Sequence, residues 1–168
     1  IITPENPRIF CSKKISMEEK NGVQWYSISQ SDDIKQWLSD IGVMGMRPVL
    51  SPMVNKNELY SNETILSPEE AAEVQSRIGS LQYYARETRY DIAAAVNMIA
   101  QRLSEPTVGV RKAINRVLAY LVGTVDKALT VPRVKGTRLD FYVDSDHAGG
   151  RKFGDTLSRT GILFLCNA

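Results

Sequence analysis

Three stretches of the chain repeat apolar residues at helical spacing, and this periodicity constrains the fold more than any other feature. In each stretch an apolar residue recurs every three or four positions, which places these residues on one face of an α-helix. The three faces are Val74, Ile78 and Leu81; Ile92, Val96, Ile99 and Leu103; and Val110, Ile114, Val117 and Leu121. Short connections favour antiparallel packing of such faces. Residues 67–123 are therefore predicted to form a compact helical bundle.

The start of the first bundle helix carries a strong local signal. Ser67 stands at the N-cap, Pro68 at the first helical position and Glu70 at N3, which together make a capping box. The preceding residues 43–66 contain prolines among polar residues and sustain no period. They are predicted to be a linker that crosses the surface.

A further helix is predicted over residues 31–42. Ser31 is a candidate cap, two aspartates follow in the first turn, and Gly42 is placed to end the helix. The apolar face of this helix makes it a candidate fourth member of the bundle.

Strand patterns lie on both sides of the helical region. Residues 8–29 predict a β-hairpin around Asn21-Gly22, a strong signal for a two-residue turn. After Gly123, the segments KALTVPR, TRLDFYVDSD and SRTGILFLCN predict strands that begin one mixed or antiparallel sheet. The predicted fold class is α+β, with an N-terminal hairpin, a helical bundle and the first strands of a truncated sheet.

Composition narrows the class of protein. The only cysteines are Cys11 and Cys166 and the only histidine is His147, which argues against a structural zinc site and a secreted disulfide scaffold. A reducing, intracellular compartment is expected, either cytoplasmic or nuclear, with the organelle left open. No apolar run approaches the roughly 20 residues that span a bilayer.

The charge is unevenly distributed. The net charge is +2, but residues 1–101 carry 10 basic and 13 acidic residues, whereas residues 102–168 carry 11 and 6. A basic C-terminal part suggests a phosphate-rich partner. On charge alone, a normally solvated basic surface explains it at least as well.

Four cations in this part are candidate nucleic-acid contacts, namely Lys112, Arg116, Arg151 and Lys152, and Arg159 is considered with them. Lys112 and Arg116 lie one turn apart on a predicted helix, where they could contact phosphates. A solvated helix face explains them equally well. Trp25 and Trp37 could stack on bases, but both fit apolar stripes and are predicted to pack in the core.

Asp144 and Asp146 mark a candidate metal site at the end of a predicted strand, in the segment DFYVDSDHAGG. Carboxylates are the ligands that Mg²⁺ prefers. The other interpretation is an exposed acidic strand end.

The order of four segments resembles the polyprotein of copia-type LTR retrotransposons. The segments are ISQSDDIKQWLSDIG…RPVLSPM, IGSLQYYARETRYDIAAAV, AINRVLAYLVGTVDKAL and YVDSDHAGG…SRTGILFL. The similar region is the end of the reverse transcriptase running into the RNase H domain. The chain starts without a methionine and ends on a strand pattern, so it is expected to be a piece of a longer product.

This resemblance implies a division into three parts. Residues 1–30 would be the end of a palm-like hairpin, residues 31–125 a helical thumb, and residues 126–168 the incomplete start of an RNase H-like domain. Asp144 would be a catalytic RNase H ligand of Mg²⁺ in the parent enzyme, with Asp146 a weak accessory.

The chain departs from the family pattern at two positions. The family usually has proline where Tyr90 stands and tryptophan where His147 stands. The family's Y-x-D-D polymerase motif is absent. One RNase H carboxylate does not hold a catalytic Mg²⁺, so the chain alone is expected to be catalytically inactive and to bind no cofactor.

Two functions follow from these observations. In the first, the chain is a fragment of an RNA-directed DNA polymerase and ribonuclease H that contributes binding of the RNA–DNA or DNA primer–template duplex. In the second, it is a non-catalytic retroelement-derived protein that acts as a structural or interaction subunit, with other protein chains covering the unfinished sheet. An unrelated helical interaction module would explain the periodicity but not the order of the segments.

Overall fold

The computed structural model describes residues 6–53, 56–133, 138–146 and 159–167. It is an α+β structure in which helices occupy the middle of the chain and antiparallel strands the two ends. No helix in these ranges is long and apolar enough to span a membrane.

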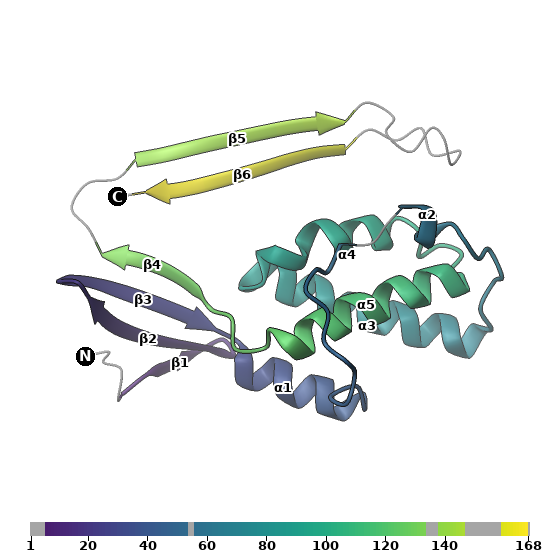
Figure 1. Cartoon of the computed structure of the whole chain (residues 1–168), viewed down its shortest axis with the longest axis horizontal. Coiled ribbons are helices and arrows are strands. Elements are labelled where there is room, and N and C mark those ends of the chain that lie inside the picture. The colour runs from purple at the N-terminus through teal and green to yellow at the C-terminus, as the bar shows by residue number, and fades with distance from the viewer. Residues whose placement is uncertain (1–5, 54–55, 134–137, 147–158, 168) are drawn as a thin grey trace.

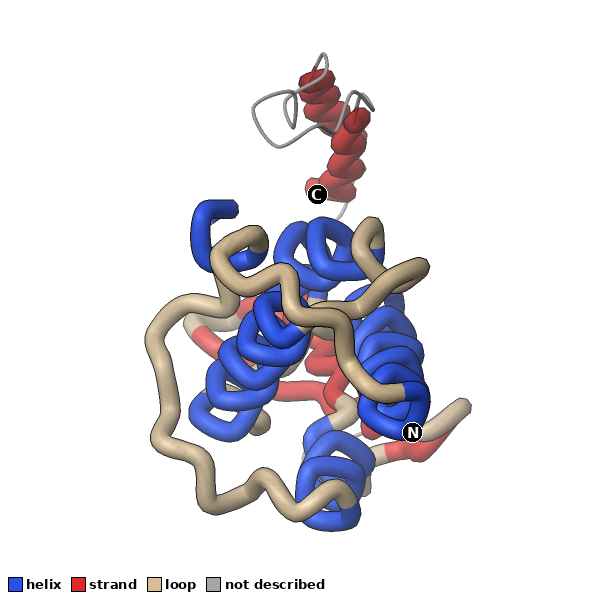
Figure 2. Tube along the Cα trace, turned by 90° about the vertical axis from the view of Figure 1, so that its right-hand side faces the viewer, coloured by secondary structure: helices blue, strands red, loops and turns tan. Residues whose placement is uncertain are grey.

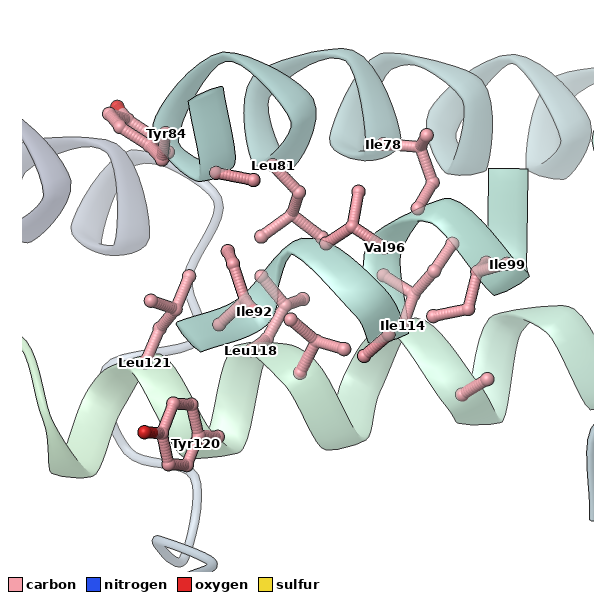
Figure 3. Packing of buried hydrophobic residues seen from close by; sticks show 14 of the residues in the cluster. Ile78, Leu81, Tyr84, Ile92, Val96, Ile99, Ile114, Leu118, Tyr120 and Leu121 are labelled. Atoms are coloured by element: carbon pink, nitrogen blue, oxygen red, sulfur yellow. The ribbon is translucent and has the colours of Figure 1, made fainter. Parts of the chain in front are cut away.

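The helices together form what is called the helical unit below. It consists of α1 (Ser31–Asp40), α2 (Lys56–Leu59), α3 (Pro68–Glu87), the 3₁₀ turn η1 (Tyr90–Ile92), α4 (Ala93–Ala100) and α5 (Val108–Gly123). Their apolar faces meet in one buried cluster (Figure 3), as the periodicity predicts. The largest fully buried apolar side chains are Ile34, Leu38, Leu59, Ile78, Leu81, Ile92, Ile99, Ile114, Leu118 and Leu121. Figure 2 shows the helices of the unit grouped together, with the linker loop running along their outside.

The helix ends confirm one prediction and correct another. The capping box is present: Ser67 Oγ accepts from the Glu70 amide at 3.3 Å, and Glu70 Oε2 accepts from the Ser67 amide at 3.1 Å. The predicted cap of α1 is wrong, because Gln30 is the N-cap and Ser31 is the first helical residue. The Ser31 amide instead donates to Ser29 Oγ at 3.0 Å.

The described residues between α1 and α3, 43–53 and 56–66, form the predicted linker, apart from the single turn of α2. The linker is tied to the start of α5, where the Val108 amide donates to the Thr64 carbonyl at 2.9 Å and the Gly109 amide to the Asn62 carbonyl at 3.1 Å. A Cβ on Gly109 would lie 2.5 Å from the Leu59 carbonyl oxygen. The close approach of α2 to α5 therefore requires glycine at this position.

The N-terminal strands are β1 (Arg8–Phe10), β2 (Lys13–Lys20) and β3 (Val23–Ser29). The β2–β3 hairpin turns at Asn21 and Gly22, with φ of 54° and 74°, and confirms the predicted hairpin. The segment before it is broken at Cys11 and Ser12, which both have positive φ, so it forms two antiparallel strands where one was expected.

The strands after the helical unit do not form the single sheet expected from the sequence. β4 (Leu129–Arg133) pairs antiparallel with β3, so the first sheet has the order β1-β2-β3-β4. β5 (Arg138–Asp146) and β6 (Arg159–Asn167) pair only with each other among the described strands. Figure 1 shows β4 beside β3 and the β5–β6 hairpin apart from them. The strand at 129–133 thus completes the N-terminal sheet rather than starting a new one.

Candidate nucleic-acid interface

The basic face of α5 lies where the sequence predicts it. The apolar stripe of α5 turns Val110, Ile114 and Val117 into the core, which leaves Lys112 and Arg116 exposed one turn apart. Thr107 caps the helix, because its side-chain oxygen accepts from the Val110 amide at 3.4 Å. A packed and capped helix gives these two cations a fixed backbone.

The cations on this face differ in what they bind within the chain. Arg116 Nε donates to the Met53 carbonyl at 2.8 Å, which draws its guanidinium toward the linker. Arg111, which sequence reasoning did not select, forms an ion pair with Glu70 of the capping box. Lys112 forms no ion pair with any residue that the structure describes.

Arg151 and Lys152 lie outside the described residues, as does His147. Arg159 starts β6, but its side chain is not among those described.

Asp144 is an exposed residue of β5, and its backbone lies opposite Gly161 of β6. Asp146 ends the strand, and its side chain is outside the described set. Within the described ranges, no group of three His, Cys, Asp or Glu side chains could hold a metal ion.

The two tryptophans, which are candidates for base stacking, are both partly buried. The ring centroids of Trp37 and Tyr84 lie 5.4 Å apart, and Trp25 is half-buried in β3 opposite Pro132. Tyr84 is 4% exposed while Tyr83 is 41% exposed. Burial, with the Asp33 carboxylate nearby, raises the pKa of the Tyr84 hydroxyl.

A second cluster of polar side chains lies where the helical unit meets the first sheet, and sequence reasoning missed it. It is called the polar joint below and consists of Gln30, Thr88, Arg89, Asp91, Tyr120, Thr124 and Lys127. At its centre Arg89, only 1% exposed, donates from Nε and Nη2 to the two carboxylate oxygens of Asp91, both at 3.0 Å. The Tyr120 hydroxyl donates to Asp91 Oδ2 at 2.7 Å.

The electrostatics of the polar joint favour charged groups. Burial raises the pKa of the Asp91 carboxyl, but the hydrogen bonds from Arg89 and Tyr120 and the charges of Arg89 and Lys127 outweigh it and hold that pKa below its ordinary value. The hydrogen bond to Tyr120, with the Asp91 charge, raises the pKa of Lys127. The sequence offers one local signal for this cluster, the carboxylate of Asp91 close to the start of a helical pattern.

Comparison with known proteins gives relatives that cover most of this chain. An uncharacterized mitochondrial protein of Arabidopsis thaliana is 32% identical over 122 residues, which is 73% of this chain and 50% of that protein. The retrovirus-related Pol polyprotein from transposon RE1 of A. thaliana is 32% identical over 151 residues, 89% of this chain and 10% of the polyprotein. The Pol polyprotein from transposon TNT 1-94 of Nicotiana tabacum is 30% identical over 160 residues, 90% of this chain and 11% of the polyprotein.

This chain is homologous to copia-type retrotransposon Pol polyproteins. The resemblance predicted from the order of the segments is thereby confirmed. Each of these alignments with a Pol polyprotein covers about nine-tenths of the chain. The chain spans half of the mitochondrial relative and about a tenth of each Pol polyprotein. No protein-family model matches the chain. No solved structure matches it significantly.

Proposed function

We propose that this chain is a segment of a retrotransposon reverse transcriptase and that the helical unit contributes binding of the primer–template duplex. The observation that carries the proposal is the exposed Lys112 on the outer face of α5, in a chain homologous to Pol polyproteins. A lysine on a helix whose opposite face is fixed in a core presents its ammonium at a defined place. Such a group suits a phosphate contact that is independent of base sequence.

The proposed division of the chain follows the resemblance. The four-stranded sheet corresponds to the end of the palm, the helical unit to the thumb, and β5–β6 to the start of the RNase H part. Because β4 pairs with β3, we place the start of the RNase H part at β5 rather than at residue 126. The pairing of β4 supports a sheet that the helical unit interrupts in sequence.

The proposed role is binding and not catalysis. In the parent polyprotein, Asp144 would serve as one RNase H ligand of Mg²⁺ together with carboxylates from other segments. The proposed partner is an RNA–DNA or DNA duplex, and the proposed location is an intracellular compartment in which reverse transcription takes place.

The test is fluorescence anisotropy of a labelled RNA–DNA hybrid of mixed sequence, titrated with the whole chain at several salt concentrations. The wild-type chain should bind with an affinity that falls as salt rises and that does not depend on the duplex sequence. Lys112→Glu should weaken binding. It should also reduce the slope of log affinity against log salt by about 0.9, the value for one lost phosphate contact.

Lys35→Glu is the matched control, because it makes the same change in net charge on α1. Lys35 pairs with Asp126 at 2.6 Å and both side chains are exposed, so the loss of this pair costs little stability. An equal effect of the two variants would mean that net charge, and not the α5 face, governs binding. Absence of duplex affinity in the wild-type chain would overturn the proposal and favour the interaction-subunit alternative.

A further inference from the structure

The polar joint lies where the chain crosses between the helical unit and the four-stranded sheet. The chain leaves the sheet at Gln30, between β3 and α1, and returns to it through Thr124 and Lys127, between α5 and β4. The segment Thr88–Arg89, between α3 and η1, lies against both crossings, because it bonds to Gln30 and to Thr124.

The two parts differ in how they are held together. The buried apolar cluster consists of residues of the helices and their connecting loops, and no described strand residue belongs to it. The strand residues of β3 are all only partly buried. Apolar burial therefore stabilises the helical unit and contributes little to its attachment to the sheet.

Directional polar contacts lie at the crossing beside Gln30 and between β2 and α3. Thr88 Oγ1 donates to Gln30 Oε1 at 2.9 Å in a buried hydrogen bond. Lys13 of β2 pairs with Glu87 at the end of α3, with 2.6 Å between Nζ and Oε2. Hydrogen bonds weaken steeply when donor and acceptor are misaligned, whereas apolar contacts are non-directional. Polar contacts thus specify an angle between two parts, which apolar contacts do much less.

Arg89, which follows Thr88 in the chain, is the centre of a second set of polar contacts. Besides its two bonds to Asp91, its Nη2 donates to Thr124 Oγ1 at 2.7 Å. The Thr124 hydroxyl donates to the Tyr120 carbonyl at 2.7 Å. Lys127 Nζ donates to the Tyr120 hydroxyl at 2.8 Å. The Arg89 guanidinium thus bonds directly to Thr124, at the C-terminal end of α5. Through Asp91 and Tyr120 it is linked to Lys127, which precedes β4.

We propose that Arg89 and Asp91 are positioning residues that set the angle between the helical unit and the four-stranded sheet. Arg89 is suited to this role because its planar guanidinium fixes a carboxylate in two places at once. The proposal concerns orientation and not the stability of the core, and it does not depend on whether the chain binds a duplex.

The test measures that orientation in the whole chain by pulsed electron paramagnetic resonance. Spin labels go on Glu19 of β2 and Ser76 of α3, both exposed, in a background with Cys11→Ser and Cys166→Ser. A second pair, on Ser76 and Lys112, reports on the helical unit alone. In the wild-type chain both pairs should give a single narrow distance distribution.

In Asp91→Asn and Arg89→Lys, the distance distribution of the Glu19–Ser76 pair should no longer be single and narrow. That of the Ser76–Lys112 pair should stay single and narrow. Thr124→Val, which removes one hydroxyl and no charge, gives a milder form of the same result if the stronger variants do not fold. The proposal is overturned if the Glu19–Ser76 distribution stays narrow at the wild-type distance in folded variants. It is also overturned if both pairs broaden together, because that result describes a general loss of structure.

Discussion

Asp91 is the counter-ion of the buried Arg89, and its carboxyl group determines how the polar joint responds to acid. Its carboxylate accepts two hydrogen bonds from Arg89 and one from Tyr120. Its side chain is 30% exposed while that of Arg89 is 1% exposed. Protonation of Asp91 would leave the guanidinium buried beside a neutral group, which costs free energy.

The first prediction concerns Asp91→Asn. At neutral pH the substitution should lower the free energy of unfolding by about 3 kcal/mol, because it leaves Arg89 buried without a counter-ion. The pKa of Asp91 is lower in the folded chain than its ordinary value, so its contribution is present above the unfolded pKa of about 3.9 and is lost as pH falls through the lower, folded pKa. The measurement is urea unfolding of variant and wild type at neutral pH and at a pH below the folded pKa of Asp91. The difference in the free energy of unfolding between them should be smaller at the lower pH. A difference that stays constant with pH would contradict this assignment.

The second prediction compares two helical glycines. A Cβ on Gly109 would meet the Leu59 carbonyl oxygen at 2.5 Å, whereas a Cβ on Gly79 would meet nothing within 4 Å. Gly109→Ala should therefore destabilise the chain by about 2 kcal/mol through overpacking. Gly79→Ala should stabilise it by about 0.5–1 kcal/mol, the ordinary helical preference for alanine. Thermal unfolding of both variants checks the pair, and stabilisation by Gly109→Ala would mean that α2 does not approach α5 closely.

At the scale of elements, the sequence predicts the features that depend only on neighbouring residues, such as the buried face of a helix or the position of a tight turn. The stripe of Val110, Ile114 and Val117 predicts the buried face of α5 because the helical period alone fixes which side chains share a face. The Asn21-Gly22 turn is predicted because few residues adopt positive φ at two successive positions. These signals need no knowledge of the rest of the chain.

Contacts between distant residues are harder to predict. Gln30 replaces Ser31 as the cap of α1 although serine is the better cap, and the Gln30 side chain is used in the bond to Thr88. The strand pattern of Leu129–Arg133 is read correctly, but nothing local says that its partner is β3. The candidate cation Arg116 is located correctly, whereas its bond to Met53 depends on the path of the linker.

The third prediction tests the capping box of α3. Ser67→Ala removes the oxygen that accepts from the Glu70 amide and should cost about 1 kcal/mol of stability. Ser76→Ala is the control, since Ser76 is an exposed residue in the middle of the same helix and alanine is the better helix former. Denaturant unfolding should rank Ser67→Ala below wild type and Ser76→Ala at or above it. The reverse order would show that the box adds nothing to α3.

At the scale of the whole molecule, the chain has one well-buried part and one half-buried part. Helical residues such as Leu81, Ile99 and Leu118 are fully buried, whereas every residue of β3 remains partly accessible. Local stability follows buried apolar contacts. The helical unit is therefore expected to be the last part to unfold.

The fourth prediction follows from this difference. Native-state hydrogen exchange should show the amides of β2 and β3 opening at a lower free energy than those in the middle of α3 and α5. The measurement is exchange followed by NMR or mass spectrometry at increasing, sub-denaturing urea. A single common opening free energy for strands and helices would contradict the prediction and show that the chain unfolds as one unit.

The return of β4 to β3 sets an order of events while the chain is being synthesised. The β2–β3 hairpin closes over two residues, but Tyr26 can meet Val131 only after every helix has been made. Closing so long a loop is slow and costs chain entropy. Until then the outer edge of β3 presents unpaired amides and carbonyls, which can form hydrogen bonds with a strand of another chain. Any substitution that delays folding of the helices therefore lengthens the period in which the nascent chain can aggregate through this edge.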